Sequence, residues 1–315
     1  MILEEILAVF IGIFTDYTLR YVALGSAILG VTSGALGCFT VLRKQSLFGD
    51  ALSHAALPGI GLAYLFAGTK DSLFLMLGAA VFAWFGGIVT LGIASTTRIK
   101  QDAALGITLS VFFGLGIVLL THLQSIGGAS QGGLDRFLFG QAAALIEADV
   151  INLGILAAGC FIVLILFFKE FKIATFDSAF GQSLGFPTKY LSALLTSVIV
   201  VAVVIGLNTV GVVLMVTMLI APAAAAIQWI SSLKSMLILS AIFGGISGII
   251  GSMISSTTEG MSTGPVIVIT ITTILGISLF FSPKQGYLFQ YIHRKKQRQS
   301  SLNEISTISG EDSKN

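Results

Sequence analysis

Charged residues are scarce in this 315-residue chain, which is 10% charged and 55% apolar. A typical soluble domain is roughly 25% charged, so the composition excludes an ordinary water-soluble fold. Proline is also rare, with 5 residues, whereas the 36 glycines are typical of transmembrane helices that pack closely. Long apolar stretches recur between short polar breaks. The chain is therefore predicted to be an all-α, polytopic transmembrane helical bundle.

Several catalytic and redox motifs are missing as well. The two cysteines, Cys38 and Cys160, both fall in apolar stretches, so neither a disulfide framework nor a CxxC metal site is available. The chain contains no GxxxxGK[ST] phosphate loop, no HExxH and no GxSxG. We therefore expect no enzymatic activity and no intrinsic cofactor. Any energy for its activity must come from an ion gradient or from a separate ATP-hydrolysing subunit.

Nine stretches approach the roughly 20 apolar residues that are needed to cross the hydrocarbon core of a bilayer. The sixth and seventh form one apolar run, which we divide at the polar pair Asn208-Thr209, so a count of eight spans also stays open. The predicted spans are 18–42, 51–67, 72–95, 103–123, 150–168, 190–208, 210–230, 235–255 and 263–281.

The basic residues predict the orientation, because Lys and Arg are enriched in cytoplasmic loops. With nine spans and an outside N-terminus, only Arg20, Lys70 and Arg136 of the 17 basic residues fall outside. The C-terminus is then cytoplasmic. The predicted regions are an outer apolar segment (1–17), the transmembrane domain (18–289) and a polar, disordered cytoplasmic tail (290–315).

Asp50 and His54 stand four residues apart in the stretch SLFGDALSHAALPG, residues 46–59, inside an otherwise almost uncharged, apolar chain. On a helix this spacing places both side chains on one face, roughly 5–6 Å apart at Cβ. A carboxylate oxygen and an imidazole nitrogen at that separation can bind one divalent cation. Such groups are costly in a bilayer and usually serve a function. The alternative is an N-cap aspartate at the membrane edge, followed by a histidine that only packs.

The neighbours of this pair favour the metal site. Gly49, Pro58 and Gly59 permit a broken or re-entrant helix, like the discontinuous helices that line substrate sites in transporters. Ser46 and Ser53 are candidates to orient the two ligands by hydrogen bonds. We therefore predict a broken helix with a metal site in this stretch.

Two connections carry further candidates. Residues 169–189, on the cytoplasmic side, contain Asp177, a plausible N-cap for a short helix that is closed by Gly185 and Pro187. Such a helix would suit the docking of a partner, and a structured loop between spans is the alternative. Glu259, in a predicted outside turn, either attracts cations to the mouth of a pathway or is only solvated.

The run VLRKQSLFGDALSHAALPG, residues 41–59, resembles the signature of one family, the membrane permease subunit of bacterial ABC importers for manganese, zinc and iron. Four other stretches resemble further segments of that family in the same order. They are residues 97–107, 134–140, 176–187 and 210–226.

The resemblance implies a homodimer around a central pathway in the bacterial cytoplasmic membrane. Two ATPase subunits would lie beneath it, and an extracytoplasmic metal-binding protein would deliver the ion. It also implies that Asp50 and His54 contact the metal. By the same resemblance, Asp177, Ala179 and Gly185 fall in the segment that seats the ATPase.

Two copies of the Asp50/His54 pair would offer two oxygens and two nitrogens. Such donors suit Mn²⁺ or Zn²⁺, with Fe²⁺ as the third ion of the family, and disfavour Cu(I). One alternative is a secondary metal carrier driven by protons or sodium, with Asp50 as its coupling carboxylate. A membrane scaffold in which the pair serves only packing is another.

Overall fold

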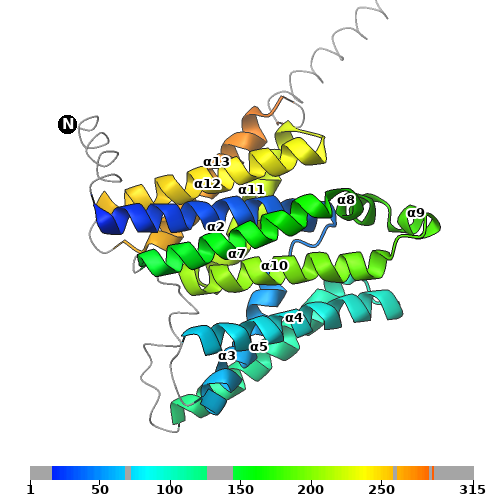
Figure 1. The fold of residues 1–315 in the computed structure, drawn as a ribbon, viewed down its shortest axis with the longest axis horizontal. Helices are drawn as coiled ribbons and strands as arrows, with labels where there is room; N and C mark the ends of the chain where they lie inside the picture. The colour runs from blue at the N-terminus through cyan, green and yellow to red at the C-terminus, as the bar shows by residue number, and fades with distance from the viewer. Residues whose placement is uncertain (1–15, 68–71, 126–144, 258–260, 284–285, 287–315) are drawn as a thin grey trace, which may run out of the picture.

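The computed structural model describes residues 16–67, 72–125, 145–257, 261–283 and 286. Within these ranges the chain forms eleven helices and no strand. Most of the long helices run roughly along the longest axis of the molecule, and two short ones lie at one end (Figure 1). The long helices are α2 (Tyr17–Leu42), α3 (Phe48–Ala67), α4 (Ser72–Thr96), α5 (Gln101–Ser125), α7 (Glu147–Leu166), α10 (Thr188–Val210), α11 (Val212–Trp229), α12 (Leu233–Thr257) and α13 (Thr263–Phe281); the short ones are α8 (Phe168–Phe176) and α9 (Ser178–Ser183).

The prediction of an all-α, polytopic membrane protein is confirmed. Each of the nine predicted spans coincides with one long helix. Among the described residues, seven helices are long and apolar enough to cross a membrane, and α3 and α11 are not among those seven. The count of spans in the described part of the chain therefore lies between seven and nine. The tail 290–315, nearly all of 1–17 and the candidate Glu259 lie outside the described residues.

The boundary between the sixth and seventh spans lies slightly later than predicted. Asn208 and Thr209 are still within α10, and the break falls at Gly211. Gly211 has a φ of +82°, a left-handed conformation that glycine adopts without the steric cost of a Cβ. The backbone conformation of this glycine, and not the polarity of the preceding pair, ends the helix.

The backbones of helices α2 and α12 approach each other closely at Gly30 and Gly244. A Cβ on Gly30 would lie 2.1 Å from the carbonyl oxygen of Gly244, and one on Gly244 would lie 2.0 Å from that of Gly30. One turn away, Ser240 Oγ donates a 2.6 Å hydrogen bond to the carbonyl of Gly34. Small residues at four-residue spacing on both helices therefore allow the two backbones to touch.

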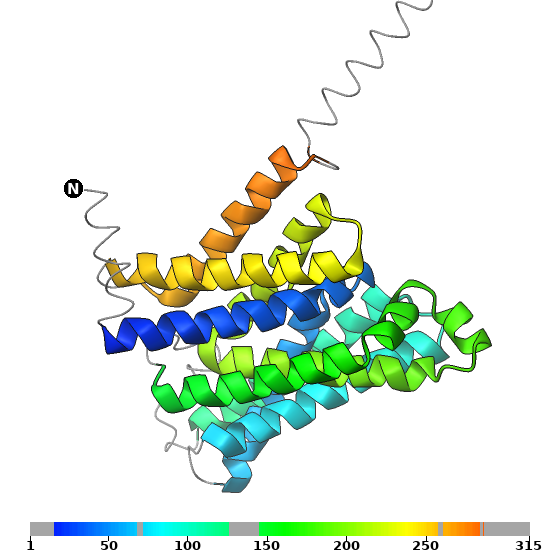
Figure 2. The same ribbon diagram turned by 45° about the horizontal axis from the view of Figure 1, so that its top comes forward.

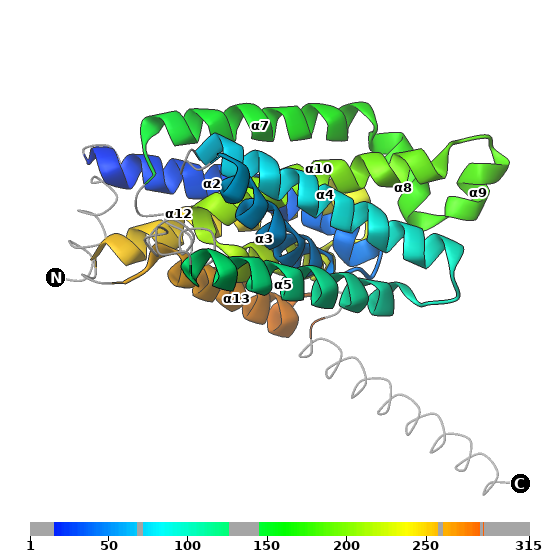
Figure 3. The same cartoon turned by 90° about the horizontal axis from the view of Figure 1, so that it is seen from below.

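The centre of the core lies where α2, α3, α10 and α11 meet. Phe39, Leu195, Met215 and Leu219 are fully buried there. Helix α3 packs between this centre and helices α4 and α5, as seen from below in Figure 3. Helix α13 diverges from α12 and runs obliquely to the other long helices (Figure 2). This arrangement places the candidate pair on α3 beside α5.

Candidate metal site

Asp50 and His54 lie one turn apart near the start of α3. Nε2 of His54 is 3.3 Å from Oδ1 of Asp50, and the two side chains are 22% and 31% exposed, respectively. Asp50 is the third residue of the helix and not its N-cap. The pair therefore presents one oxygen and one nitrogen donor on a partly open helix face.

The prediction of a broken helix through this stretch is wrong. Helix α3 continues from Phe48 to Ala67 with Pro58 inside it. The proline ring lies close to Gly116 of α5; a Cβ on Gly116 would lie 3.3 Å from Cδ of Pro58. Since Pro58 has no N–H, the carbonyl of His54 cannot receive the usual helical hydrogen bond from residue 58. The proline thus changes the hydrogen bonding at His54 without ending the helix.

The two serines of the motif lie in different surroundings. Ser53 is fully buried, and its hydroxyl has no hydrogen-bond partner in the part of the chain that the structure describes. Ser46 is exposed in the loop that precedes α3. That these serines orient Asp50 and His54 therefore stays a prediction. For Ser53, this role would require a hydrogen bond from its hydroxyl that is not present among the described residues.

Helix α5 supplies a neighbour that the sequence did not indicate. The ring of Phe113 meets the His54 imidazole edge-on, with centroids 4.8 Å apart and planes at 75°. Nδ1 of His54 is buried and has no hydrogen-bond partner among the described residues. In sequence, Phe113 is one of many apolar residues in the span 103–123, so no pattern distinguishes it.

Two side-chain donors from one copy make an incomplete metal site. Structural Zn²⁺ sites usually have four ligands, and harder divalent ions prefer more oxygen donors. Within the described ranges, no group of three or more His, Cys, Asp and Glu side chains is placed to hold a metal ion. A cation bound here therefore needs donors beyond these two side chains.

The second candidate region, residues 169–189, contains the short helix that the sequence predicts. Oδ1 of Asp177 accepts a 2.8 Å hydrogen bond from the amide of Phe180 and caps α9. Gly185, with a φ of +84°, follows the helix, and its amide donates to the carbonyl of Gln182. The amide of Phe186 donates to the carbonyl of Gly181, and the two bonds at this end form a glycine-terminated helix end of the Schellman type. Ala179 is exposed on α9 itself.

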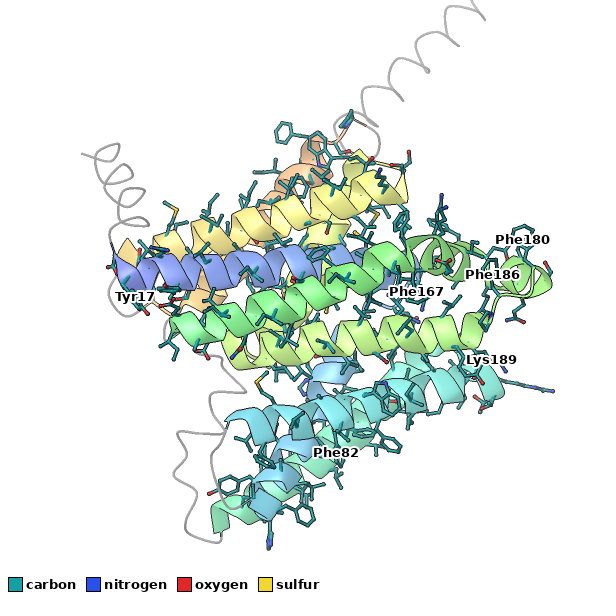
Figure 4. All side chains as sticks on the ribbon, in the orientation of Figure 1. Tyr17, Phe82, Phe167, Phe180, Phe186 and Lys189 are labelled. Atoms are coloured by element: carbon teal, nitrogen blue, oxygen red, sulfur yellow. The ribbon has the colours of Figure 1, made fainter. Side chains whose placement is uncertain are left out.

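Apolar side chains are exposed around α9, and we call them the α9 surface. Phe180 projects from α9 away from the bundle, and Phe186 and Lys189 lie close by (Figure 4). A hollow of about 230 Å³ lies beside it, lined by residues of α2, α8, α11 and α12 and of the connection between α11 and α12. Exposed apolar patches of this kind mark interaction sites. The α9 surface comprises Phe176, Phe180, Leu184 and Tyr190, each at least 55% exposed.

Arg43 connects the loop before α3 to α8. Its Nε donates a 3.2 Å hydrogen bond to Oγ1 of Thr175. Burial lowers the pKa of the Arg43 guanidinium to about 10, so it stays charged at neutral pH. Close by, the rings of Phe39 and Phe171 pack edge-to-face with centroids 6.1 Å apart. The loop that leads into α3 and the candidate metal site is therefore held against α8, the helix that precedes α9.

A comparison with protein-family models matches residues 15–282 to the ABC 3 transport family. The chain belongs to this family. It is 46% identical over 284 residues to the zinc transport system membrane protein TroC of Treponema pallidum, covering 90% of this chain and 95% of that protein. It is also 46% identical over 285 residues to the manganese transport system membrane protein MntC of Bacillus subtilis, covering 90% of this chain and 66% of the longer relative.

A solved structure agrees with this assignment. The chain superposes on PsaBC from Streptococcus pneumoniae in complex with Fab with a TM-score of 0.76 and 34% identity, covering 91% of this chain and 99% of the other. The resemblance seen in the sequence is thus confirmed. This ABC 3 family member is a membrane permease, a subunit without catalytic activity of its own.

Proposed function

We propose that two copies of this permease form a pathway for Mn²⁺ or Zn²⁺, and that Asp50 and His54 of each copy bind the ion. The observation that carries the proposal is the 3.3 Å contact between a carboxylate and an imidazole on a partly open face of α3. Two such pairs would supply four donors, which one chain does not. Relatives at 46% identity are named for zinc and for manganese.

Selectivity between Mn²⁺ and Zn²⁺ would depend on the geometry of the site and on which ion is delivered to it. Sites built from nitrogen and oxygen bind Zn²⁺ more tightly than Mn²⁺ in the Irving–Williams order, so affinity alone would favour zinc. Binding in a pathway must also be weak enough to allow release. We include Fe²⁺ as a third candidate because the same donors accept it.

An ATP-hydrolysing partner would dock on the α9 surface, and a metal-binding protein would deliver the ion at the opposite end. A charge asymmetry supports this orientation, because cytoplasmic loops are rich in basic residues. Near the α9 end, eight basic residues lie in or beside the connections between helices, and they are Arg43, Lys44, Arg98, Lys100, Lys169, Lys172, Lys189 and Lys234. The N-terminus would then lie outside the cell and the C-terminus in the cytoplasm.

Uptake by the variants Asp50→Asn and His54→Ala tests the pair. The measurement is accumulation of radioactive Mn²⁺ and Zn²⁺ in cells that lack the natural gene and express each variant at equal membrane levels. We expect each variant to reduce uptake at least about 10-fold, since even residues that only orient metal ligands change affinity 10- to 100-fold. Asp102→Asn is the matched control, because Asp102 also lies in the first turn of its helix, α5, and is exposed. Normal uptake by Asp50→Asn would overturn the metal site.

The energy source is tested separately. An importer of the proposed kind should co-purify with an ATPase, and its uptake should cease when that ATPase is inactivated. Uptake that continues without the ATPase and collapses with an ionophore would instead show an ion-coupled carrier, with Asp50 as the coupling group.

A further inference from the structure

Among the residues that the structure describes, Nδ1 of His54 has no hydrogen-bond partner, and a phenylalanine ring lies against the imidazole instead. We infer that Phe113 positions this imidazole for the metal. The inference rests on the proposed function, because it assumes that His54 is a ligand. Phe113 would not contact the ion itself; it would act through the orientation of His54.

The need for an orienting contact follows from the two nitrogens of the ring. Nε2 faces Asp50 at 3.3 Å, whereas Nδ1 is buried without a partner in the described part of the chain. Metal-binding histidines usually donate their second N–H to a carboxylate, a carbonyl or water, and this bond fixes the ring. Rotation about the last torsion of histidine is otherwise broad. A different contact must therefore restrict the ring here.

Phe113 provides that contact in a favourable geometry. The centroid distance of 4.8 Å and the 75° angle between the planes describe an edge-to-face pair, which aromatic rings prefer over a stacked sandwich. Phe113 is 38% exposed, whereas its neighbour Phe112 is 7% exposed and packs against Phe82 and Phe85 of α4. Phe112 thus serves the packing of α4 with α5, and Phe113 is left to contact His54.

The register of α3 and α5 fixes this contact. His54 meets Phe113, and three residues further along both helices Leu57 meets Gly116. A Cβ on Gly116 would lie only 2.8 Å from Cβ of Leu57, so the glycine allows α5 to approach closely. The next contact in the series joins Gly61 to Leu119. The separation of the helices at Gly116 therefore determines how near Phe113 comes to His54.

Binding of Mn²⁺ to the purified importer tests the inference. The measurements are the Mn²⁺ dissociation constant and the ¹⁴N coupling to Mn²⁺ in pulsed electron paramagnetic resonance, which reports a bound imidazole. In the wild type we expect a coupling that His54→Ala removes. Phe113→Leu, which keeps the bulk but loses the ring, should weaken binding about 10-fold and diminish the coupling. Phe113→Tyr should restore both, and Leu115→Ala, on an exposed part of α5, should leave both unchanged.

A pair of glycine variants tests the register without touching either ring. Gly116→Ala should push α5 from α3 and weaken Mn²⁺ binding as Phe113→Leu does. Gly114→Ala is the control, because a Cβ on Gly114 would meet no atom within 4 Å. If Phe113→Leu folds poorly, Gly116→Ala still decides the question.

The outcomes separate this inference from the proposed function. A wild type without a coupling that depends on His54 would overturn the metal site itself. A wild-type coupling that Phe113→Leu and Gly116→Ala leave unchanged would overturn only the positioning role. Equal losses in Phe113→Leu and Phe113→Tyr would show that retaining the ring does not preserve binding, and would also overturn the positioning role of the aromatic contact.

Discussion

Substituting alanine for Gly30 or Gly244 should destabilise the fold by separating α2 from α12. Ordinary van der Waals contact of a Cβ begins at 3.4 Å, whereas the added Cβ atoms would lie 2.1 Å and 2.0 Å from carbonyl oxygens. The obstructing atoms are backbone atoms, so no side chain can rotate away. The two helices must therefore move apart by about 1 Å or more, which forfeits a quarter to a half of the dispersion energy of each contact between them.

The magnitude follows from the cost of overpacking. Extra methyl groups in a well-packed interior typically cost about 1–3 kcal/mol, and this contact is at the upper end because it involves two backbones. We expect about 2–3 kcal/mol for each single variant. The Ser240 hydrogen bond to the carbonyl of Gly34 should weaken as well, since it spans the same two helices. The double variant should cost less than the sum, because one separation accommodates both methyl groups.

Thermal unfolding of the purified permease in detergent measures this effect. Gly30→Ala and Gly244→Ala should each lower the midpoint by about 5 °C or more. Gly154→Ala and Gly159→Ala on α7 are the matched controls, because no atom lies within 4 Å of their added Cβ and alanine favours a helix. A midpoint for Gly244→Ala that equals those of the α7 controls would refute the reasoning.

Two further predictions concern helix ends outside the spans. Lys44 has a φ of +58°, a conformation that glycine adopts without strain. Lys44→Gly should therefore leave stability unchanged or raise it by up to about 1 kcal/mol, whereas the β-branched Lys44→Val should lower it. Unfolding midpoints measure both effects. Asp177→Ala removes the cap of α9 and should cost about 1 kcal/mol locally. It should reduce co-purification of the ATPase while Mn²⁺ binding stays at the wild-type level; unchanged co-purification would argue against docking on α9.

The helices could be predicted from the sequence because they are determined by local residue chemistry or by the thickness of the membrane. The thickness of the hydrocarbon core sets the length of an apolar span, so nine runs of the right length coincide with nine helices. Asp177 and Gly185 signal the ends of α9 through their own backbone and side-chain chemistry. The adjacency of Asp50 and His54 follows from the helical period alone.

The remaining features depend on contacts between distant parts of the chain. Helix α3 continues through Pro58, and Gly116 on another helix lets α5 approach closely beside this proline. Polarity located the break after the sixth span at residues 208–209, but the left-handed backbone of Gly211 determines it. Phe113 becomes significant only because α5 packs beside His54. No periodicity within either segment contains that information.

Stability alone does not explain the hydrogen bond between Arg43, at the end of α2, and Thr175 of α8. Nη2 of Arg43 is buried and has no partner within the described ranges, and an unsatisfied charged donor in the interior opposes folding. An apolar side chain of similar volume would fill the same space without that cost. The contact does hold the loop before α3 against the helix that precedes α9. We therefore expect the contact to transmit movement between the two regions. A partner on the α9 surface that displaced α8 would move the short loop that holds Arg43. That loop leads directly into the first turn of α3, where Asp50 lies.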